Sequence, residues 1–171
     1  MKPISSHIVE NTWKEVGGME PWQVPELVDK MGKQQPVIIA YILAVDQDVF
    51  NQAERELLLY LALVVWRIMS KGDTPLSSIT EDILQKAENS NLKMLEYFEK
   101  ESDAGFFEAA ELMIKNYNQP EVLRYILDAV MEEECDVMGE DVEEYLVRDE
   151  NKGLMIIHLK TIIDCFDRGS D

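Results

Sequence analysis

The sequence contains few of the residues that form disulfide frameworks and metal sites. Its 171 residues include two cysteines and two histidines. Cys135 and Cys165 lie thirty positions apart and form no CxxC pair, so neither a disulfide framework nor a zinc site is indicated. Eight glycines and six prolines are also few, and they stand at the ends of apparent helices. These scarcities favour a helical protein of the reducing cytoplasm, and we expect no metal and no other cofactor.

Basic residues are scarce as well. Sixteen lysines and arginines stand against 34 aspartates and glutamates, which gives a net charge of −18. A field this negative opposes binding to nucleic-acid phosphates or to an anionic membrane, and it favours basic protein partners. Long apolar runs are missing too, because the longest, Leu57–Trp66, has ten residues, about half of what a membrane-spanning helix needs. We therefore expect no nucleic-acid or membrane partner.

Apolar residues recur at helical spacing along almost the whole chain, and no alternating run bounded by turn residues indicates a strand. The sequence therefore predicts an all-α fold. A capping box at residues 78–81 is expected to start a linking helix, and the apolar helix around residues 57–66 is expected at the centre of the core. The expected helices cover about residues 6–17, 25–32, 36–45, 52–71, 78–90, 92–98, 106–113, 120–130 and 153–166.

Two stretches of the chain are near-copies of each other. Residues 35–43 read QPVIIAYIL and residues 119–127, 84 positions later, read QPEVLRYIL, with five of nine positions identical. This match indicates an internal duplication. We expect a single all-α domain over residues 1–171, in which two related halves (1–72 and 91–171) of about four helices each are joined by a linking helix at 78–90. The halves could stack like helical repeats or form a compact pseudo-twofold bundle.

The second copy differs from the first by an acidic insertion. Twenty-one positions separate Pro36 from Leu57, whereas 34 separate Pro120 from Leu154. The added length coincides with residues 132–150, which hold ten carboxylates and one arginine. Because insertions in repeats often lie on a binding face, the leading hypothesis is a non-catalytic interaction or adaptor protein that binds a basic partner there. The predicted contact residues are Glu132, Glu133, Glu134, Asp136, Glu140, Asp141, Glu143, Glu144 and Tyr145.

Catalytic motifs are absent from the sequence. It contains no Glu-x-x-His pair of the kind that carboxylate-bridged metal bundles need, and no glycine-rich phosphate loop. We predict no catalytic residue and no metal ligand. An alternative hypothesis is a small-ligand- or metal-binding bundle, or an enzyme, with a pocket between the halves formed by Tyr41, Tyr125 and His158. A third is an acidic mimic of nucleic acid. The simpler expectation for His158 is a core or boundary histidine bonded to a carbonyl group.

Overall fold

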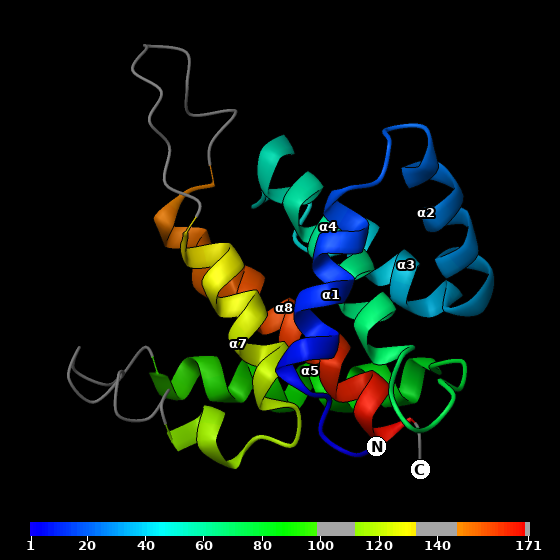
Figure 1. The fold of residues 1–171 in the computed structure, drawn as a ribbon. Coiled ribbons are helices and arrows are strands. Elements are labelled where there is room, and N and C mark those ends of the chain that lie inside the picture. Colours follow the sequence, from blue (N-terminus) through cyan, green and yellow to red (C-terminus); the bar gives the residue numbers. More distant parts are fainter. Residues whose placement is uncertain (99–111, 133–146, 170–171) are drawn as a thin grey trace.

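The computed structural model describes residues 1–98, 112–132 and 147–169, and all the regular structure in these ranges is helical (Figure 1). The helices are α1 (Ser6–Gly17), α2 (Gln23–Gln34), α3 (Pro36–Ala44), α4 (Gln52–Met69), α5 (Glu81–Phe98), α7 (Pro120–Met131) and α8 (Asp149–Arg168). Residues 112–116 are also helical. None of the described helices is apolar enough over a sufficient length to cross a membrane.

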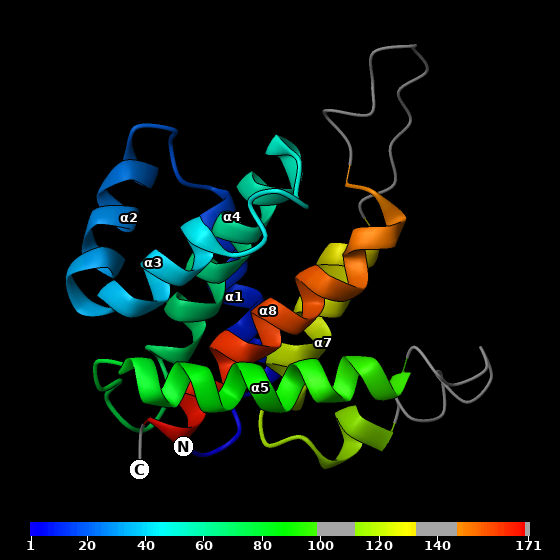
Figure 2. The same cartoon turned by 180° about the vertical axis from the view of Figure 1, so that it is seen from behind.

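Two helices, α4 and α8, form the centre of the molecule. Six consecutive residues of α4, 61–66, are buried, as the sequence predicted, and ten consecutive residues of α8, 157–166, are buried as well. Helix α8 packs against α4, α5 and α7, and α4 packs against α1, α2 and α3. Figure 1 shows α1 and α7 on the near side, and Figure 2 shows α5 crossing the opposite side. The apolar side chains of these layers join in one hydrophobic core.

Buried glutamine side chains bond to the non-helical segments ahead of α1 and α5. Gln35 Oε1 accepts a hydrogen bond from the amide of Ile79 at 3.0 Å, and its Nε2 donates to the carbonyl of Ser77 at 2.9 Å. Gln119 repeats this pattern with the N-terminal segment of the chain. Its Oε1 accepts from the amide of Ile4 at 3.0 Å, and its Nε2 donates to the carbonyl of Lys2 at 3.2 Å. Each glutamine thus satisfies two backbone groups of a segment distant in sequence.

The start of α5 differs from the expected capping box. The sequence predicted that Ser78 would cap a helix beginning at residue 79, but α5 begins at Glu81, and the Thr80 hydroxyl accepts from the amide of Ile83 at 3.4 Å. The bonds from Gln35 explain this difference, since they engage the carbonyl of Ser77 and the amide of Ile79 and the helix begins only after them.

The end of α5 also differs from the prediction. A helix end was expected near residues 89–91, because asparagine side chains often bond to the local backbone and stop helices there. Instead, α5 continues to Phe98. The side chain of Asn91 is buried and bonds to three side chains of α8, those of Thr161, Asp164 and Lys160. It therefore does not compete for the local backbone, and the expected linking helix and the start of the second half form one helix.

The boundaries of three other helices differ by a few residues from those expected from the sequence. Helix α2 begins two residues before Pro25, because proline is tolerated within a first turn, and it continues two residues past Gly32. Helix α4 ends at Met69, where the hydroxyl of Ser70 turns back to the carbonyl of Trp66 at 2.7 Å. Helix α8 begins at Asp149, four residues before the expected start at Gly153.

The glutamine bonds lead to a test of stability. Gln35→Ala and Gln119→Ala should each lower the free energy of unfolding by about 2 kcal/mol, because each leaves the amide of a buried residue, Ile79 or Ile4, and a partly buried carbonyl without this partner. Chemical denaturation monitored by circular dichroism measures this loss. Gln34→Ala is the control, since Gln34 is exposed at the end of α2. Equal stability of all three variants would show that the two bonds contribute nothing.

Candidate functional site

The buried carboxylate of Glu54 joins the starts of α4 and α8. It accepts from the amide of Asn51 at 2.9 Å, within a capping box that begins α4. The guanidinium of Arg148, the N-cap residue of α8, donates from Nε at 3.0 Å and from Nη2 at 2.8 Å, in a bidentate pair. The backbone amide of Arg148 donates at 2.9 Å and the side chain of Asn151 at 3.0 Å. These contacts fix where α8 begins.

This environment keeps Glu54 charged. Burial by itself raises the pKa of Glu54, but the hydrogen bonds from Arg148, Asn51 and Asn151 outweigh it and lower the pKa to about 2. The carboxylate, which is 0% exposed, therefore remains ionised at neutral pH and holds the guanidinium of Arg148 beside it. Arg148 is the single basic residue among residues 132–150. The one positive charge of the acidic stretch, on Arg148, is thus already paired with a buried carboxylate.

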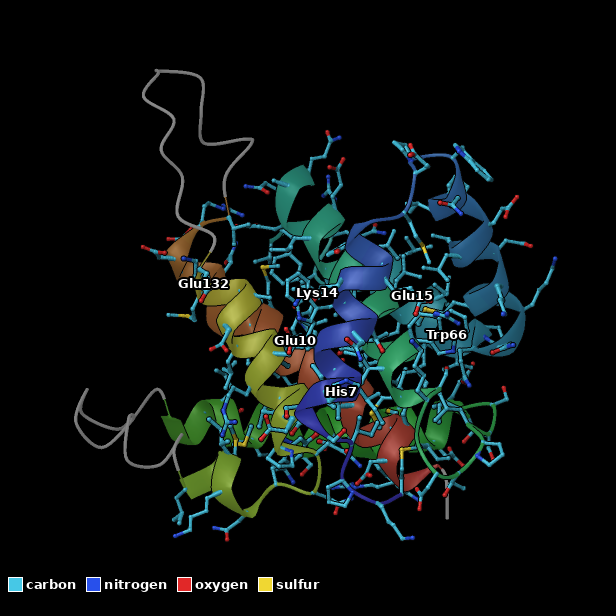
Figure 3. All side chains as sticks on the ribbon, in the orientation of Figure 1. His7, Glu10, Lys14, Glu15, Trp66 and Glu132 are labelled. Carbon is cyan, nitrogen blue, oxygen red and sulfur yellow. The ribbon has the colours of Figure 1, made fainter. Side chains whose placement is uncertain are left out.

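The structure describes one of the nine residues predicted to contact a basic partner. Glu132 is the C-cap residue of α7, and its side chain is exposed. Figure 3 shows it close to the first turns of α8. The other eight lie outside the described residues: Glu133, Glu134, Asp136, Glu140, Asp141, Glu143, Glu144 and Tyr145. Their segment connects two described anchor points, the end of α7 and the Glu54–Arg148 pair.

The three residues of the alternative pocket lie in two separate places. Tyr41 on α3 and His158 on α8 form a hydrogen bond of 2.6 Å between Oη and Nδ1. Tyr125 on α7 lies instead against Trp13 of α1, with nearly parallel rings whose centroids are 6.5 Å apart. The ring of Phe50 packs edge-on against the imidazole of His158. The structure thus brings Tyr41 and His158 together and places Tyr125 at another contact.

Asp46 is a third member of the Tyr41–His158 cluster that sequence reasoning missed. Its Oδ2 lies 2.7 Å from His158 Nε2. Asp46 adopts a φ of 46°, in the left-handed region that non-glycine residues rarely occupy, although aspartate tolerates it better than most. The expectation that His158 bonds to a carbonyl group was wrong, because both of its ring nitrogens bond to side chains. The only local sequence signal for Asp46 is that tolerance.

The surroundings of His158 favour a neutral imidazole. Its Nε2 donates to the carboxylate of Asp46, and its Nδ1 lies against the hydroxyl of Tyr41. Burial lowers the pKa of His158 below its usual value, and the charges of Asp46 and Glu88 only partly oppose this. Burial, followed by the charge of Glu88 and a hydrogen bond to it, raises the pKa of the Tyr41 hydroxyl. Tyr41 is therefore a poor nucleophile.

A second buried polar cluster joins α5 and α8. Lys160 Nζ lies 2.8 Å from Asp164 Oδ2 and 2.9 Å from Asn91 Oδ1, and it stands over the ring of Tyr117 at 4.7 Å from the centroid. The hydroxyl of Tyr117 donates to Asp164 Oδ1 at 2.6 Å. The charges of this cluster compensate each other inside the core. Its contacts are those of a structural cluster that orients α5 on α8.

The described residues do not present the geometry of an active site. His158 is 2% exposed and both of its nitrogens are engaged, so it offers neither a base to a substrate nor a ligand to a metal. Within residues 1–98, 112–132 and 147–169, no group of three or more His, Cys, Asp and Glu side chains is placed to hold a metal ion. Comparison with known proteins yields no relative: no family model, curated protein or solved structure matches the chain.

The low pKa of Glu54 predicts an acid-sensitive contribution to stability. Because the folded pKa of about 2 lies below the usual value of about 4.3, the contribution is complete above pH 4.3 and is lost as pH falls towards 2. Glu54→Gln should lower the free energy of unfolding by about 2 kcal/mol at pH 7, because it removes the ion pair with Arg148. The loss is smaller than for a fully buried pair, because Arg148 is partly exposed and keeps some hydration. Denaturation curves from pH 7 to about pH 2.5 should show the two proteins converging.

Glu56→Gln is the matched control for this experiment. Glu56 lies on the same helix, is exposed, and accepts only from Gln52 among the described contacts, so its loss should change stability by less than about 0.5 kcal/mol. A difference between Glu54→Gln and the wild type that stays constant down to about pH 2.5 would contradict the low pKa of Glu54.

The buried imidazole of His158 predicts a second pH dependence of stability, which arises because the fold favours the uncharged form of this side chain. With the folded pKa of His158 below about 6.5, the unfolded chain takes up a proton that the folded chain resists, so stability is retained above pH 6.5 and declines below it. Proton NMR of the imidazole signals, assigned with His7→Gln, should give this low pKa directly. Asp46→Asn should lower the pKa further, because the Asp46 carboxylate raises it. An unchanged or higher pKa in that variant would rule out the contact.

Proposed function

We propose that the chain is a non-catalytic interaction protein that binds a basic protein partner through an acidic surface around residues 132–150. The observation that carries this proposal is the engagement of Arg148 by buried Glu54. Residues 133–146 contain seven carboxylates and no lysine or arginine. With Arg148 bonded to the core, a basic partner meets no competing positive charge within this stretch.

The described flanks of the acidic stretch support the same proposal. On the α8 side, Lys152 pairs with Asp149 at 2.9 Å, and its side chain is largely buried. On the α7 side, Arg124 pairs with Glu121 at 2.9 Å. Glu132 and Glu150 are exposed. The basic side chains that flank the stretch in sequence therefore already have carboxylate partners.

We further propose that the acidic stretch was added to one copy of a duplicated helical unit. The two glutamine contacts support a duplication, because Gln35 and Gln119 precede α3 and α7 in the same way and bond to equivalent backbone groups ahead of α1 and α5. In this pairing the counterpart of α1 is the whole of α5. With a second half that begins at residue 91, the counterpart would be residues 92–98 alone. The N-cap residues of α4 and α8, Asn51 and Arg148, both bond to Glu54.

The alternative function, a ligand-binding bundle or enzyme, has weaker support. Asp46, His158 and Tyr41 have the order of an orienting carboxylate, a base and a hydroxyl group, which is the arrangement that activates nucleophiles. However, the imidazole is enclosed by Phe50 and is nearly inaccessible, and Tyr125 lies at another contact. The acidic-surface proposal needs no such access.

The test of the proposed function is a charge-neutralised variant. A deletion of residues 134–150 would remove Arg148 together with the acidic residues and leave Glu54 buried without its partner. A variant with Glu140→Gln, Asp141→Asn, Glu143→Gln and Glu144→Gln keeps that pair. Immobilised wild type should retain basic proteins from a lysate at low salt and release them at moderate salt, because screening weakens exposed charge pairs. The variant should retain clearly less, as measured by quantitative mass spectrometry.

The matched control neutralises the same number of exposed carboxylates elsewhere, at Glu20, Glu26, Glu81 and Glu96. It has the same net charge as the test variant, so a general effect of charge would reduce capture equally in both. Equal loss in the two variants, or capture that salt does not weaken, would refute a local acidic binding surface. Circular dichroism should show unchanged helicity in both.

A further inference from the structure

The corner between α3 and α4 contains a hollow of about 590 Å³. Its walls come from the end of α3, the α3–α4 connection (residues 45–51) and the first turns of α4. Three aliphatic and three charged side chains are among those that line it: Ile42, Leu43, Leu59, Asp48, Arg55 and Glu56. Sites for small ligands have volumes of this order and combine an apolar surface with a few charged or polar groups.

Arg55 is the one cation that lines the hollow, and the α3–α4 connection orients it. Its Nη1 donates to the carbonyl of Gln47 at 3.1 Å and to that of Phe50 at 2.8 Å. Arg67 and Arg148 each pair with a carboxylate, whereas none of the described contacts joins Arg55 to one. Its Nε and Nη2 therefore remain able to donate to an anion, and a carboxylate matches the geometry of a guanidinium.

The two carboxylates of the hollow lie on exposed residues of different elements. Asp48 belongs to the α3–α4 connection, and Glu56 follows Arg55 on α4. Glu56 Oε1 accepts from the side-chain amide of Gln52 at 2.7 Å, and within the described part of the chain neither carboxylate pairs with a lysine or arginine. Both can therefore accept hydrogen bonds from an ammonium group.

The aliphatic side chains give the hollow an apolar surface beside these charges. Ile42 is buried and Leu59 is half-buried, while Leu43 is 53% exposed although it lines a concave surface. An aliphatic group of a ligand that covers Leu43 would remove apolar surface from water, which favours binding. The hollow thus offers a guanidinium, two carboxylates and an apolar surface to the same ligand.

We infer that this hollow is a binding site for a small zwitterion, namely a free amino acid with an aliphatic side chain. The carboxylate of the ligand pairs with Arg55, its ammonium group with Asp48 and Glu56, and its side chain packs on Leu43. A simple anion would be repelled by the two carboxylates, and a simple cation by the guanidinium, so the mixed charge selects a ligand that carries both signs. The site adds small-molecule binding to the proposed function and does not depend on it.

The experiment titrates the protein with leucine and with three molecules that each lack one of its parts. These are 4-methylpentanoate, which has no ammonium group, 3-methylbutylamine, which has no carboxylate, and glycine, which has no side chain. Two-dimensional NMR of the backbone amides should show leucine binding at residues 42–59 with a Kd of about 1 mM, which is reasonable for so few atoms in an open hollow. Each of the other three should bind roughly tenfold more weakly.

A double variant, Asp48→Asn with Glu56→Gln, tests the charge selection and leaves the bonds of Arg55 to the connection in place. It should bind leucine roughly tenfold more weakly and 4-methylpentanoate more tightly than wild type does, because the repulsion of the anion is removed. The matched control is Asp82→Asn with Glu81→Gln, which makes the same two changes at exposed positions in the first turn of α5. It should leave both affinities unchanged.

Several results would overturn the inference. Leucine could cause no saturable change at tens of millimolar, or its changes could lie outside residues 42–59. Equal affinity of wild type for leucine and 4-methylpentanoate would show that the ammonium group is not recognised. Equal weakening of leucine binding in the two double variants would assign the effect to net charge instead of to the hollow. All four substituted side chains are exposed, and the same NMR spectra verify that both variants fold.

Discussion

The burial of α8 on all sides is the constraint on which the rest of the structure depends. Ten consecutive residues of this helix are buried, and they include His158, Lys160 and Asp164. A buried polar or charged group destabilises the fold unless it has a partner, so each of these residues needs a matching group on a neighbouring element. The partners come from α3, from the α3–α4 connection and from α5. An apolar helix could rotate or slide among its neighbours, whereas α8 has one position in which all these bonds form.

Such contacts also determine which of the charges that sum to −18 are exposed on the surface. Several of the sixteen basic residues lie inward or in tight pairs: Lys160 within the core, Arg148 on Glu54, and Arg67 and Lys71 together on Glu15 between α1 and α4. The pairs of Arg67, Lys71 and Arg148 join parts of the chain that are distant in sequence. These cations stabilise the fold, and many carboxylates remain exposed on the surface. Net charge alone does not reveal this division, because it counts a buried and an exposed charge equally.

The sequence was sufficient for the fold class and for the helices whose ends depend on local chemistry. Helix α1 begins after its N-cap Ser5, and α3 and α7 begin at Pro36 and Pro120, at the positions predicted for these helices. The errors arose where a side chain bonds across the structure. Ser78 failed as a cap because Gln35 holds residues 77–79, and Asn91 did not end a helix because it bonds to α8. In the candidate site, Asn51-x-x-Glu54 is a recognisable capping box, but its bond to Arg148 spans 94 positions. No local pattern encodes such a pairing.

The separation in sequence between α8 and its partners has a consequence for how the chain folds. The bond from Tyr41 to His158 spans 117 positions, that from Asn151 to Glu54 spans 97, and that from Asn91 to Thr161 spans 70. Loops of this length close late and slow the folding reaction. During synthesis, α3, α4 and α5 leave the ribosome before α8 exists, with Glu54 and Asp46 still hydrated. The contacts that neutralise these buried polar groups can therefore form only after residues 149–168 have emerged.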